Sequence, residues 1–346
     1  MTGPVPHWPG RLVELASGER VWVAETQARV QQANTELVLC VHGMSGAATN
    51  WTDLMAELAP DFDCVALDLP GSGLSAPPKK TAGYSISALA DTVIRVIEHL
   101  TSDRDRDAAD HGAPDHGAPD QGAPSHRGGV HLIGNSMGGA VSVRVAARRP
   151  DLVRTLTLIS PAMPDLKLRR TVAHFPVLAL PFVGEWLVRQ WAVRYPVENR
   201  VNGVFANCYS DPSRVHPDRF AHEVEALRRR DTLSYDAASL VGAARTLVTE
   251  TLRPSPFSLW RAAGRVTAPS LVLFGRDDQL VHPRLADRAA RVFRNASVRV
   301  LPETGHLAQM EHPGLVADLF REMVEQTRTA RPDAGNSASR APVDAR

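Results

Sequence analysis

Short apolar runs alternate along the chain with longer segments whose apolar residues recur at helical spacing. The runs predict strands over residues 11–15, 20–24, 37–41, 63–68, 130–134, 154–159, 270–275 and 297–301. The segments between them predict helices over residues 51–58, 85–100, 137–148, 283–292 and 313–326. Alternation of this kind is typical of a mostly parallel sheet with helices on both faces. The pattern therefore predicts an α/β fold built on an eight-stranded sheet.

The stretch from about residue 102 to residue 128 breaks this rhythm. Its centre repeats Asp-His-Gly-Ala-Pro, Asp-His-Gly-Ala-Pro and Asp-Gln-Gly-Ala-Pro. Such a segment cannot bury enough apolar surface to offset the entropy cost of ordering, so it predicts a disordered insert. His111 and His116 raise the alternative of metal binding, but a spaced pair without orienting structure is a poor metal site, which favours a plain spacer. The polar residues 327–346 predict a disordered tail.

Residues 161–264 form a second irregular region, between the sixth and seventh predicted strands. They contain several Trp and Tyr residues, with Pro at intervals that would break helices. Roughly a hundred residues is too long for a simple connecting loop in a compact domain. The sequence therefore predicts a core made of residues 1–160 and 265–326, interrupted by a helical subdomain over 161–264.

The charge of the chain is close to balanced, with 39 basic and 38 acidic residues and a net charge of +1. This balance provides no field that would attract nucleic acid or an anionic membrane. Cys40, Cys64 and Cys208 are widely spaced, which argues against a disulfide framework or a zinc site and fits a reducing cytoplasm. The start of the chain lacks the pattern of a signal peptide, and the apolar region 175–188 is interrupted and shorter than the ~20 residues of a membrane span. We therefore expect a cytoplasmic protein without an integral membrane segment or a nucleic-acid partner.

A candidate nucleophile lies in Gly134-Asn-Ser-Met-Gly-Gly139, directly after an apolar strand and directly before a predicted helix. The pattern Gly-x-Ser-x-Gly in a strand–turn–helix context is the nucleophile elbow. The serine then sits on a tight, strained turn, where side chains at the flanking Gly positions would clash. The helix that follows favours developing negative charge. Ser136 is therefore the predicted nucleophile.

A serine nucleophile needs a base, and the base needs an acid that fixes its tautomer. His306 follows the last predicted strand, on the edge where α/β sheets place their catalytic groups. His42 precedes the serine in another motif, and His312 lies near the start of a helix, so His306 is the better candidate. Asp277 and Asp278 follow another strand, and only one of these adjacent carboxylates can face the site.

Two backbone N–H groups are expected to bind an oxyanion. Met44 follows the strand that ends in Val41-His42-Gly43, and Met137 follows the serine. Each such donor contributes on the order of 3 kcal/mol to the chemical step.

Taken together, these motifs resemble the α/β-hydrolase family. The resemblance also includes Asp68-Leu-Pro-Gly-Ser-Gly-Leu-Ser75 and Gly275-Arg-Asp-Asp278. It implies that Asp278 is the triad acid, that the order is Ser136, Asp278, His306, and that residues 161–264 are a helical cap over the active site.

The sub-family is less sharply indicated. The motif around Ser136 and His306-Leu-Ala-Gln-Met-Glu-His312 is similar to that of the meta-cleavage-product hydrolases, which cleave C–C bonds. Those enzymes usually carry Trp where this chain has Leu307, and a Gly-rich loop where it has Gly43-Met-Ser-Gly46. Epoxide hydrolases and dehalogenases of this fold use an Asp nucleophile, against which Ser136 argues.

The sequence therefore predicts a serine hydrolase that acts on an ester or related acyl bond of a small, largely apolar substrate, without a cofactor or a metal. C–C bond hydrolysis and a cofactor-independent perhydrolase remain alternatives within the same fold. A non-catalytic ligand-binding receptor is an alternative of a different class, which the presence of all three triad residues disfavours.

Overall fold

The computed structural model describes residues 5, 7–26, 35–110, 129–167 and 169–329. Its centre is one eight-stranded sheet in the order β1-β2-β4-β3-β5-β6-β7-β8. Pairs β1–β2 and β2–β4 are antiparallel, and the others are parallel. The strands are β1 Gly10–Glu14, β2 Arg20–Glu25, β3 Leu37–Val41, β4 Asp63–Leu67, β5 Val130–Asn135, β6 Val153–Ile159, β7 Ser270–Gly275 and β8 Ala296–Leu301. The predicted fold class and all eight predicted strands are confirmed.

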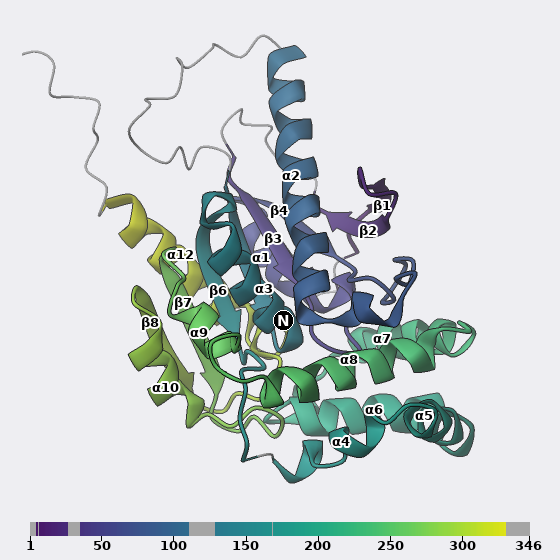
Figure 1. The fold of residues 1–346 in the computed structure, drawn as a ribbon. Helices are drawn as coiled ribbons and strands as arrows, with labels where there is room; N and C mark the ends of the chain where they lie inside the picture. Colours follow the sequence, from purple (N-terminus) through teal and green to yellow (C-terminus); the bar gives the residue numbers. More distant parts are fainter. Residues whose placement is uncertain (1–4, 6, 27–34, 111–128, 168, 330–346) are drawn as a thin grey trace, which may run out of the picture.

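Helices cover both faces of this sheet, as Figure 1 shows. One face packs against α2 (Ile86–Asp110), α3 (Met137–Arg148), α9 (Leu259–Ala263) and α10 (Leu285–Val292). The other packs against α1 (Thr52–Leu58) and α12 (Pro313–Thr329). The central strands β3, β5 and β7 are buried along their whole length, which explains why they are continuous apolar runs in the sequence. The five predicted helices are all present; four agree with the predicted bounds to within three residues, and α2 extends ten residues further.

Helix α2 is longer than the sequence predicted. We placed the disordered insert from about 102, but the helix continues to Asp110. Its last turns are held by charges, because Arg104 pairs with Asp63 at the start of β4 and Asp103 pairs with His99 and Arg106 on its own helix. The remainder of the predicted insert, including most of the repeat, His111 and His116, lies outside the described residues.

The C-terminal helix also extends past the predicted boundary. The tail was expected to begin at 327, but α12 runs to Thr329, and the hydroxyls of Thr327 and Thr329 bond carbonyls one turn back. Residues 330–346 lie outside the described residues.

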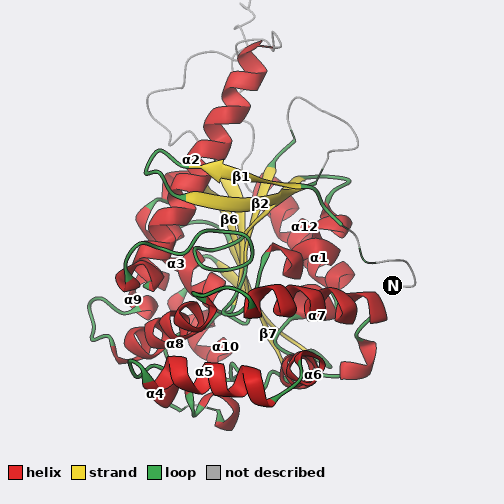
Figure 2. Ribbon diagram, turned by 90° about the vertical axis from the view of Figure 1, so that its right-hand side faces the viewer, coloured by secondary structure: helices red, strands yellow, loops and turns green. Residues whose placement is uncertain are grey.

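A group of helices connects β6 to β7, within residues 161–264. They are α4 (Phe175–Leu178), α5 (Val183–Arg194), α6 (Val197–Cys208), α7 (Pro217–Asp231) and α8 (Asp236–Leu252), followed by α9. Figures 1 and 2 place α4 to α8 together beyond the carboxyl ends of the parallel strands. Helix α9 instead packs on α3, and its Trp260 belongs to the core beside the sheet.

Several large apolar side chains of this helical group face outward. Phe182 is 87% exposed, Trp186 59% and Trp191 45%.

The opposite pole of the molecule is formed by the far end of α2. No helix in the described part of the chain is long and apolar enough to cross a membrane.

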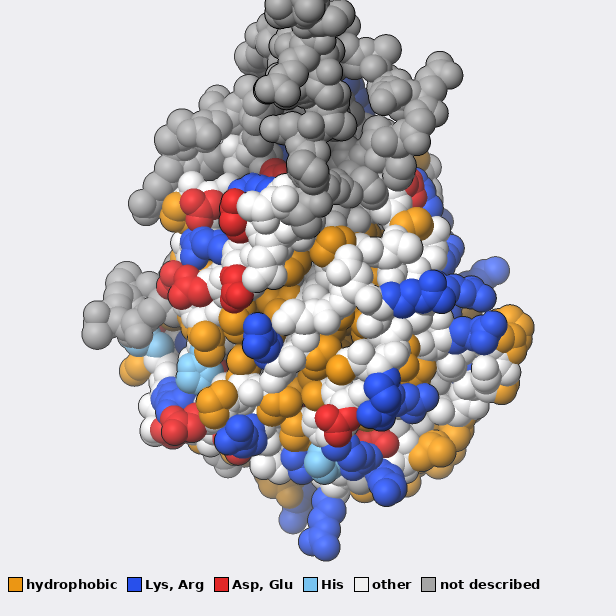
Figure 3. All heavy atoms as spheres, turned by 90° about the vertical axis from the view of Figure 1, so that its left-hand side faces the viewer, with side chains coloured by type: hydrophobic (Ala, Val, Ile, Leu, Met, Phe, Trp, Pro, Cys, Tyr) orange, Lys and Arg blue, Asp and Glu red, His pale blue; other side chains and the backbone are white. Residues whose placement is uncertain are grey.

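The charged surface is mixed. On the face drawn in Figure 3, acidic side chains lie beside basic ones. Pairs such as Arg321–Asp61 and Arg148–Asp91 are exposed, and each contributes little to stability.

Candidate active site

Ser136 occupies a strained turn between β5 and α3. Its φ is 54° and its ψ is −120°, a conformation that costs on the order of 1–3 kcal/mol. A Cβ at Gly134 would lie 2.6 Å from the carbonyl oxygen of Gly138, and a Cβ at Gly138 would overlap the carbonyl of Val41. The two motif glycines are therefore required by close backbone packing, as the sequence pattern implied.

Backbone hydrogen bonds hold this turn in place. The N–H of Ser136 donates to the carbonyl of Ile159 at the end of β6. Its carbonyl accepts from Ala140 in the first turn of α3 and from Ala162 in the loop after β6. The strained residue is thus fixed by two neighbouring strands and a helix.

His306 and Asp278 lie together at the carboxyl ends of β8 and β7. The distance from His306 Nδ1 to Asp278 Oδ2 is 2.8 Å, and both side chains are buried. The other carboxylate oxygen of Asp278 accepts from the N–H groups of Leu280 and Val281. Burial alone would raise the pKa of Asp278, but the charge and hydrogen bond of His306 and the Val281 N–H outweigh it and hold this pKa below its ordinary value.

Asp277, the other carboxylate considered, turns away from His306. Its Oδ2 accepts a hydrogen bond from the Ser210 hydroxyl at 2.8 Å, after α6. The two adjacent acids therefore have different partners, and only Asp278 contacts the imidazole.

The backbone of His306 is fixed by groups that the sequence did not single out. Its N–H donates to the carbonyl of Cys208 at 2.6 Å, and its carbonyl accepts from the Asn135 amide at 3.0 Å. The buried carboxylate of Glu311 accepts from the N–H groups of Gly305, Ser210 and Asp211. Asn135 is the variable residue before Ser136 in the elbow motif, and Glu311 lies in the segment His306–His312. No sequence pattern marks either residue as a support for His306.

The loop that contains Met44 comes next to the serine. A Cβ at Gly43 would lie 2.9 Å from Ser136 Cβ, so the loop after β3 and the elbow are in close contact. The backbone N–H groups of Met44 and Met137 make no hydrogen bond within the part of the chain that the structure describes. The oxyanion-binding role of these two N–H groups stays a prediction.

His42 and Asp68 hold the shape of this loop. The Nδ1–H of His42 donates to the Gly43 carbonyl, and its Nε2 accepts from the Leu69 N–H, which defines a neutral ring. Burial lowers the pKa of His42 to about 4, in agreement with that state. Asp68 accepts from the N–H groups of Ala48 and Leu74, while burial raises its pKa to about 6. Both residues belong to motifs found in the sequence, but the motifs did not predict these roles.

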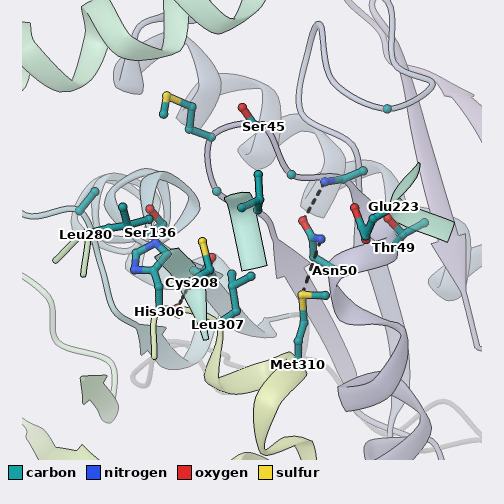
Figure 4. Close-up of a pocket in the computed structure, with 18 of the residues that line it drawn as sticks. Ser45, Thr49, Asn50, Ser136, Cys208, Glu223, Leu280, His306, Leu307 and Met310 are labelled. Carbon is teal, nitrogen blue, oxygen red and sulfur yellow. Dashed lines mark hydrogen bonds between the residues drawn. The ribbon is translucent and has the colours of Figure 1, made fainter. Parts of the chain in front are cut away.

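A cavity of about 420 Å³ opens beside these groups. Ser136, His306, Gly43 and Met44 line it, together with residues from the helical group. In Figure 4, Ser136 and His306 lie next to each other at one end. Within the described part of the chain, the His306 ring is hydrogen-bonded to Asp278 and not to the Ser136 hydroxyl.

The site has no features of a metal centre. Among the described residues, no group of three or more His, Cys, Asp or Glu side chains could hold a metal ion. Cys208 is free and lies close to His306, and burial raises the pKa of its thiol to about 12. Such a thiol is inert near neutral pH.

Known proteins share this organisation. The chain is 28% identical to the 2-hydroxy-6-oxononadienedioate/2-hydroxy-6-oxononatrienedioate hydrolase of Cupriavidus pinatubonensis, an alignment that covers 84% of this chain and 86% of that protein. It is 22% identical to the hydrolase YugF of Bacillus subtilis, with 85% and 92% covered. A thermophilic esterase from Thermogutta terrifontis has the same fold, with a TM-score of 0.65 and 22% identity over 92% of this chain and 99% of that chain.

Beyond these single relatives, the chain also matches a family as a whole. The sequence pattern of the Alpha/beta hydrolase family matches residues 38–319, which include every candidate site residue. Together with the sheet order and the loops described above, this match shows that the chain is a hydrolase belonging to the alpha/beta hydrolase family.

Proposed function

We propose that this protein is a serine hydrolase that cleaves a carboxylic ester, with Ser136, His306 and Asp278 as its triad. The observation that carries the proposal is the buried 2.8 Å hydrogen bond between His306 and Asp278, next to a serine held at a φ of 54°. Asp278 keeps its negative charge because its pKa is below the ordinary value, so it can stabilise the imidazolium that forms during the reaction.

The reaction begins when the Ser136 oxygen attacks the ester carbonyl and its proton moves to Nε2 of His306. The C=O electron pair moves to the carbonyl oxygen, which the N–H groups of Met44 and Met137 bind. Collapse of this intermediate breaks the bond to the leaving oxygen, which takes the proton from His306. Water then attacks the acyl-enzyme in the same way, and the acid product and free serine are formed.

Substrate selection is assigned to the helices between β6 and β7. We propose that residues 161–264 act as a cap, because Val201 and Phe205 of α6 and Leu227 of α7 line the same cavity as Ser136. Most of the lining is apolar, which suits a small and largely apolar substrate.

The test is labelling by a fluorophosphonate probe in wild type and in Ser136→Ala. Labelling and the hydrolysis of p-nitrophenyl esters should both disappear in the variant, while its melting temperature stays close to that of wild type. Ser142→Ala is the matched control, because Ser142 is a buried serine of α3 that does not line the cavity. Equal labelling of wild type and Ser136→Ala would exclude the proposal.

Cleavage of a C–C bond is the second candidate. It is favoured by the likeness to the Cupriavidus pinatubonensis hydrolase, whose name describes an oxo-dienedioate substrate. Turnover of vinylogous diketo acids at rates well above those for p-nitrophenyl esters would select it over ester hydrolysis. The Ser136→Ala variant would lose either activity, so the substrate panel makes the distinction.

A further inference from the structure

The end of the cavity away from Ser136 has a different chemistry from the rest. Figure 4 shows Glu223 and Thr49 at that end, with Asn50 between them and the pair Ser136–His306. Glu223 belongs to α7, and Thr49 and Asn50 belong to the short 3-10 helix Ala48–Trp51 after β3. Polar groups from two distant parts of the chain therefore meet on one wall of a cavity whose lining is mostly apolar.

Glu223 has an oxygen without a partner. Neither carboxyl oxygen of Glu223 hydrogen-bonds a residue that the structure describes: Oε1 is fully buried, while Glu223 itself lines the cavity and leaves Oε2 as the oxygen open to it. Burial raises the pKa of Glu223, and the nearby charges of Arg219 and Arg230 only partly oppose this effect. Leaving a buried carboxyl without a donor is unfavourable, and in a cavity a ligand can supply that donor.

The two neighbouring guanidinium groups, both in the described part of the chain, make their hydrogen bonds to acceptors other than Glu223. Arg219 donates to the Thr49 carbonyl, the Thr52 hydroxyl and the carboxylate of Asp53. Arg230 is paired with Asp236 and with the carbonyl of Ser45. Each cation is directed to other acceptors, so the Glu223 carboxyl receives no hydrogen bond from the residues that the structure describes.

Asn50 complements Glu223 with a donor. Its amide oxygen accepts from the Ala47 N–H at 3.0 Å, which fixes the orientation of the amide. Among the described residues, the partner of its NH2 group is the sulfur of Met310 alone, at 3.7 Å, and sulfur is a weak acceptor. An acceptor on Glu223 and a donor on Asn50 therefore stand on the same wall.

We propose that Glu223 and Asn50 form a subsite that binds a hydroxyl group of the substrate, at a position remote from the bond that is cleaved. A hydroxyl can donate to Glu223 and accept from Asn50 at the same time, whereas a plain alkyl group leaves both unpaired. This inference rests on the proposed ester hydrolysis and specifies its substrate class as hydroxylated acyl esters.

The expected selectivity follows from the cost of leaving these groups unpaired. A site built to hydrogen-bond a hydroxyl discriminates strongly against the analogue that lacks it. A hydrogen bond to a charged or partly charged group contributes about 1.5–3 kcal/mol, which corresponds to roughly a 10- to 100-fold preference.

The test compares p-nitrophenyl esters of ω-hydroxyalkanoic acids with their unsubstituted alkyl isosteres over a series of chain lengths. In wild type, kcat/KM should favour the hydroxy ester by at least about tenfold at one or two lengths. Glu223→Leu should abolish this preference, so that kcat/KM for the hydroxy ester falls to that of its alkyl isostere measured with the same variant. Glu223→Gln should keep part of it, because glutamine retains an acceptor oxygen. Glu225→Gln, an exposed residue of the same helix, is the matched control and should behave as wild type.

Binding gives a readout that does not depend on turnover. Calorimetry with Ser136→Ala should show tighter binding of the hydroxy ester than of its isostere, and the difference should vanish when Glu223→Leu is added. A preference that is absent at every chain length, or one that persists unchanged in Glu223→Leu, would overturn the subsite. If wild type hydrolysed none of the esters, the proposed function would be refuted instead. The binding comparison with Ser136→Ala would still test the subsite.

Folding of the variants is checked by their melting temperatures. Glu223→Leu should melt at or above the wild-type temperature, because it removes a buried carboxyl oxygen that has no partner. A stable variant without the hydroxyl preference would establish that Glu223 is kept for recognition.

Discussion

The loops at the carboxyl ends of the strands and the helices between β6 and β7 meet at the cavity, but they are built differently. In the loops, Asp278, His306, His42 and Asp68 each have defined hydrogen-bond partners. The helices carry exposed apolar side chains and a buried carboxyl oxygen without a partner. The loops thus hold the proposed catalytic groups in place, whereas the helices carry groups that we propose for substrate binding.

The largest effect is expected where the loops are most constrained. Asp278→Asn should reduce kcat by about 10⁴-fold with little change in the melting temperature, because the amide cannot stabilise the imidazolium. Asp277→Asn is the control, since Asp277 bonds Ser210 rather than His306, and it should stay within a few-fold of wild type. Steady-state kinetics with one p-nitrophenyl ester measures both. Equal losses in the two variants would contradict the assignment of the acid.

A second prediction concerns the core under the loops. Phe274 of β7 is completely buried, so Phe274→Ala should lower the free energy of unfolding by about 3–5 kcal/mol. Urea denaturation monitored by circular dichroism gives this value. A loss below about 1 kcal/mol would mean that the sheet is packed more loosely than its burial indicates.

The third prediction uses the neutral ring of His42. Its folded-state pKa of about 4 lies below the usual value of 6.5, so between these pH values the unfolded chain binds a proton that the folded chain does not. Stability from this group is complete above pH 6.5 and is lost as the pH falls towards 4, by about 3 kcal/mol in total.

His42→Gln isolates that contribution. The gap in unfolding free energy between wild type and the variant should narrow as the pH is lowered from 7 to 4.5, because glutamine does not titrate. Denaturation curves at the two pH values measure the gap. A constant gap would show that the imidazole is not held neutral.

The smallest effect is expected on the outer face of the helices. Trp186 is 59% exposed on α5, so Trp186→Ser should change the free energy of unfolding by no more than about 0.5 kcal/mol. The much larger loss of unfolding free energy expected for Phe274→Ala would separate the packed core from this outer face. A loss of several kcal/mol would mean that this face packs against something in solution, which a mass measurement on the native protein would identify.

The sequence was sufficient for the sheet and for the positions of its loops. Buried strands such as β3 are continuous apolar runs, and the elbow at Ser136 follows a local pattern of glycines. Local patterns could not reveal contacts between distant segments. The extension of α2 depends in part on Arg104 meeting Asp63, and the support of His306 depends on Asn135 and Glu311.

The polar wall of the cavity was out of reach of sequence reasoning for the same reason. Glu223 is one of several acidic residues on an amphipathic helix, and Glu225, two residues further along, is a glutamate that is exposed instead. Which one enters the cavity is decided by the packing of α7 over the loop that contains Asn50. The expectation of a largely apolar pocket therefore described most of the lining but not this end.

The long helix α2 has a practical consequence for engineering. It ends at Asp110, and β5 begins at Val130, so both ends of the intervening segment lie at the amino edge of the sheet, while the cavity lies at the carboxyl edge. A fluorescent reporter or an immobilisation peptide spliced between these two points would project from the pole opposite the cavity. The chain thus provides an attachment point at which cargo and substrate would not compete for space.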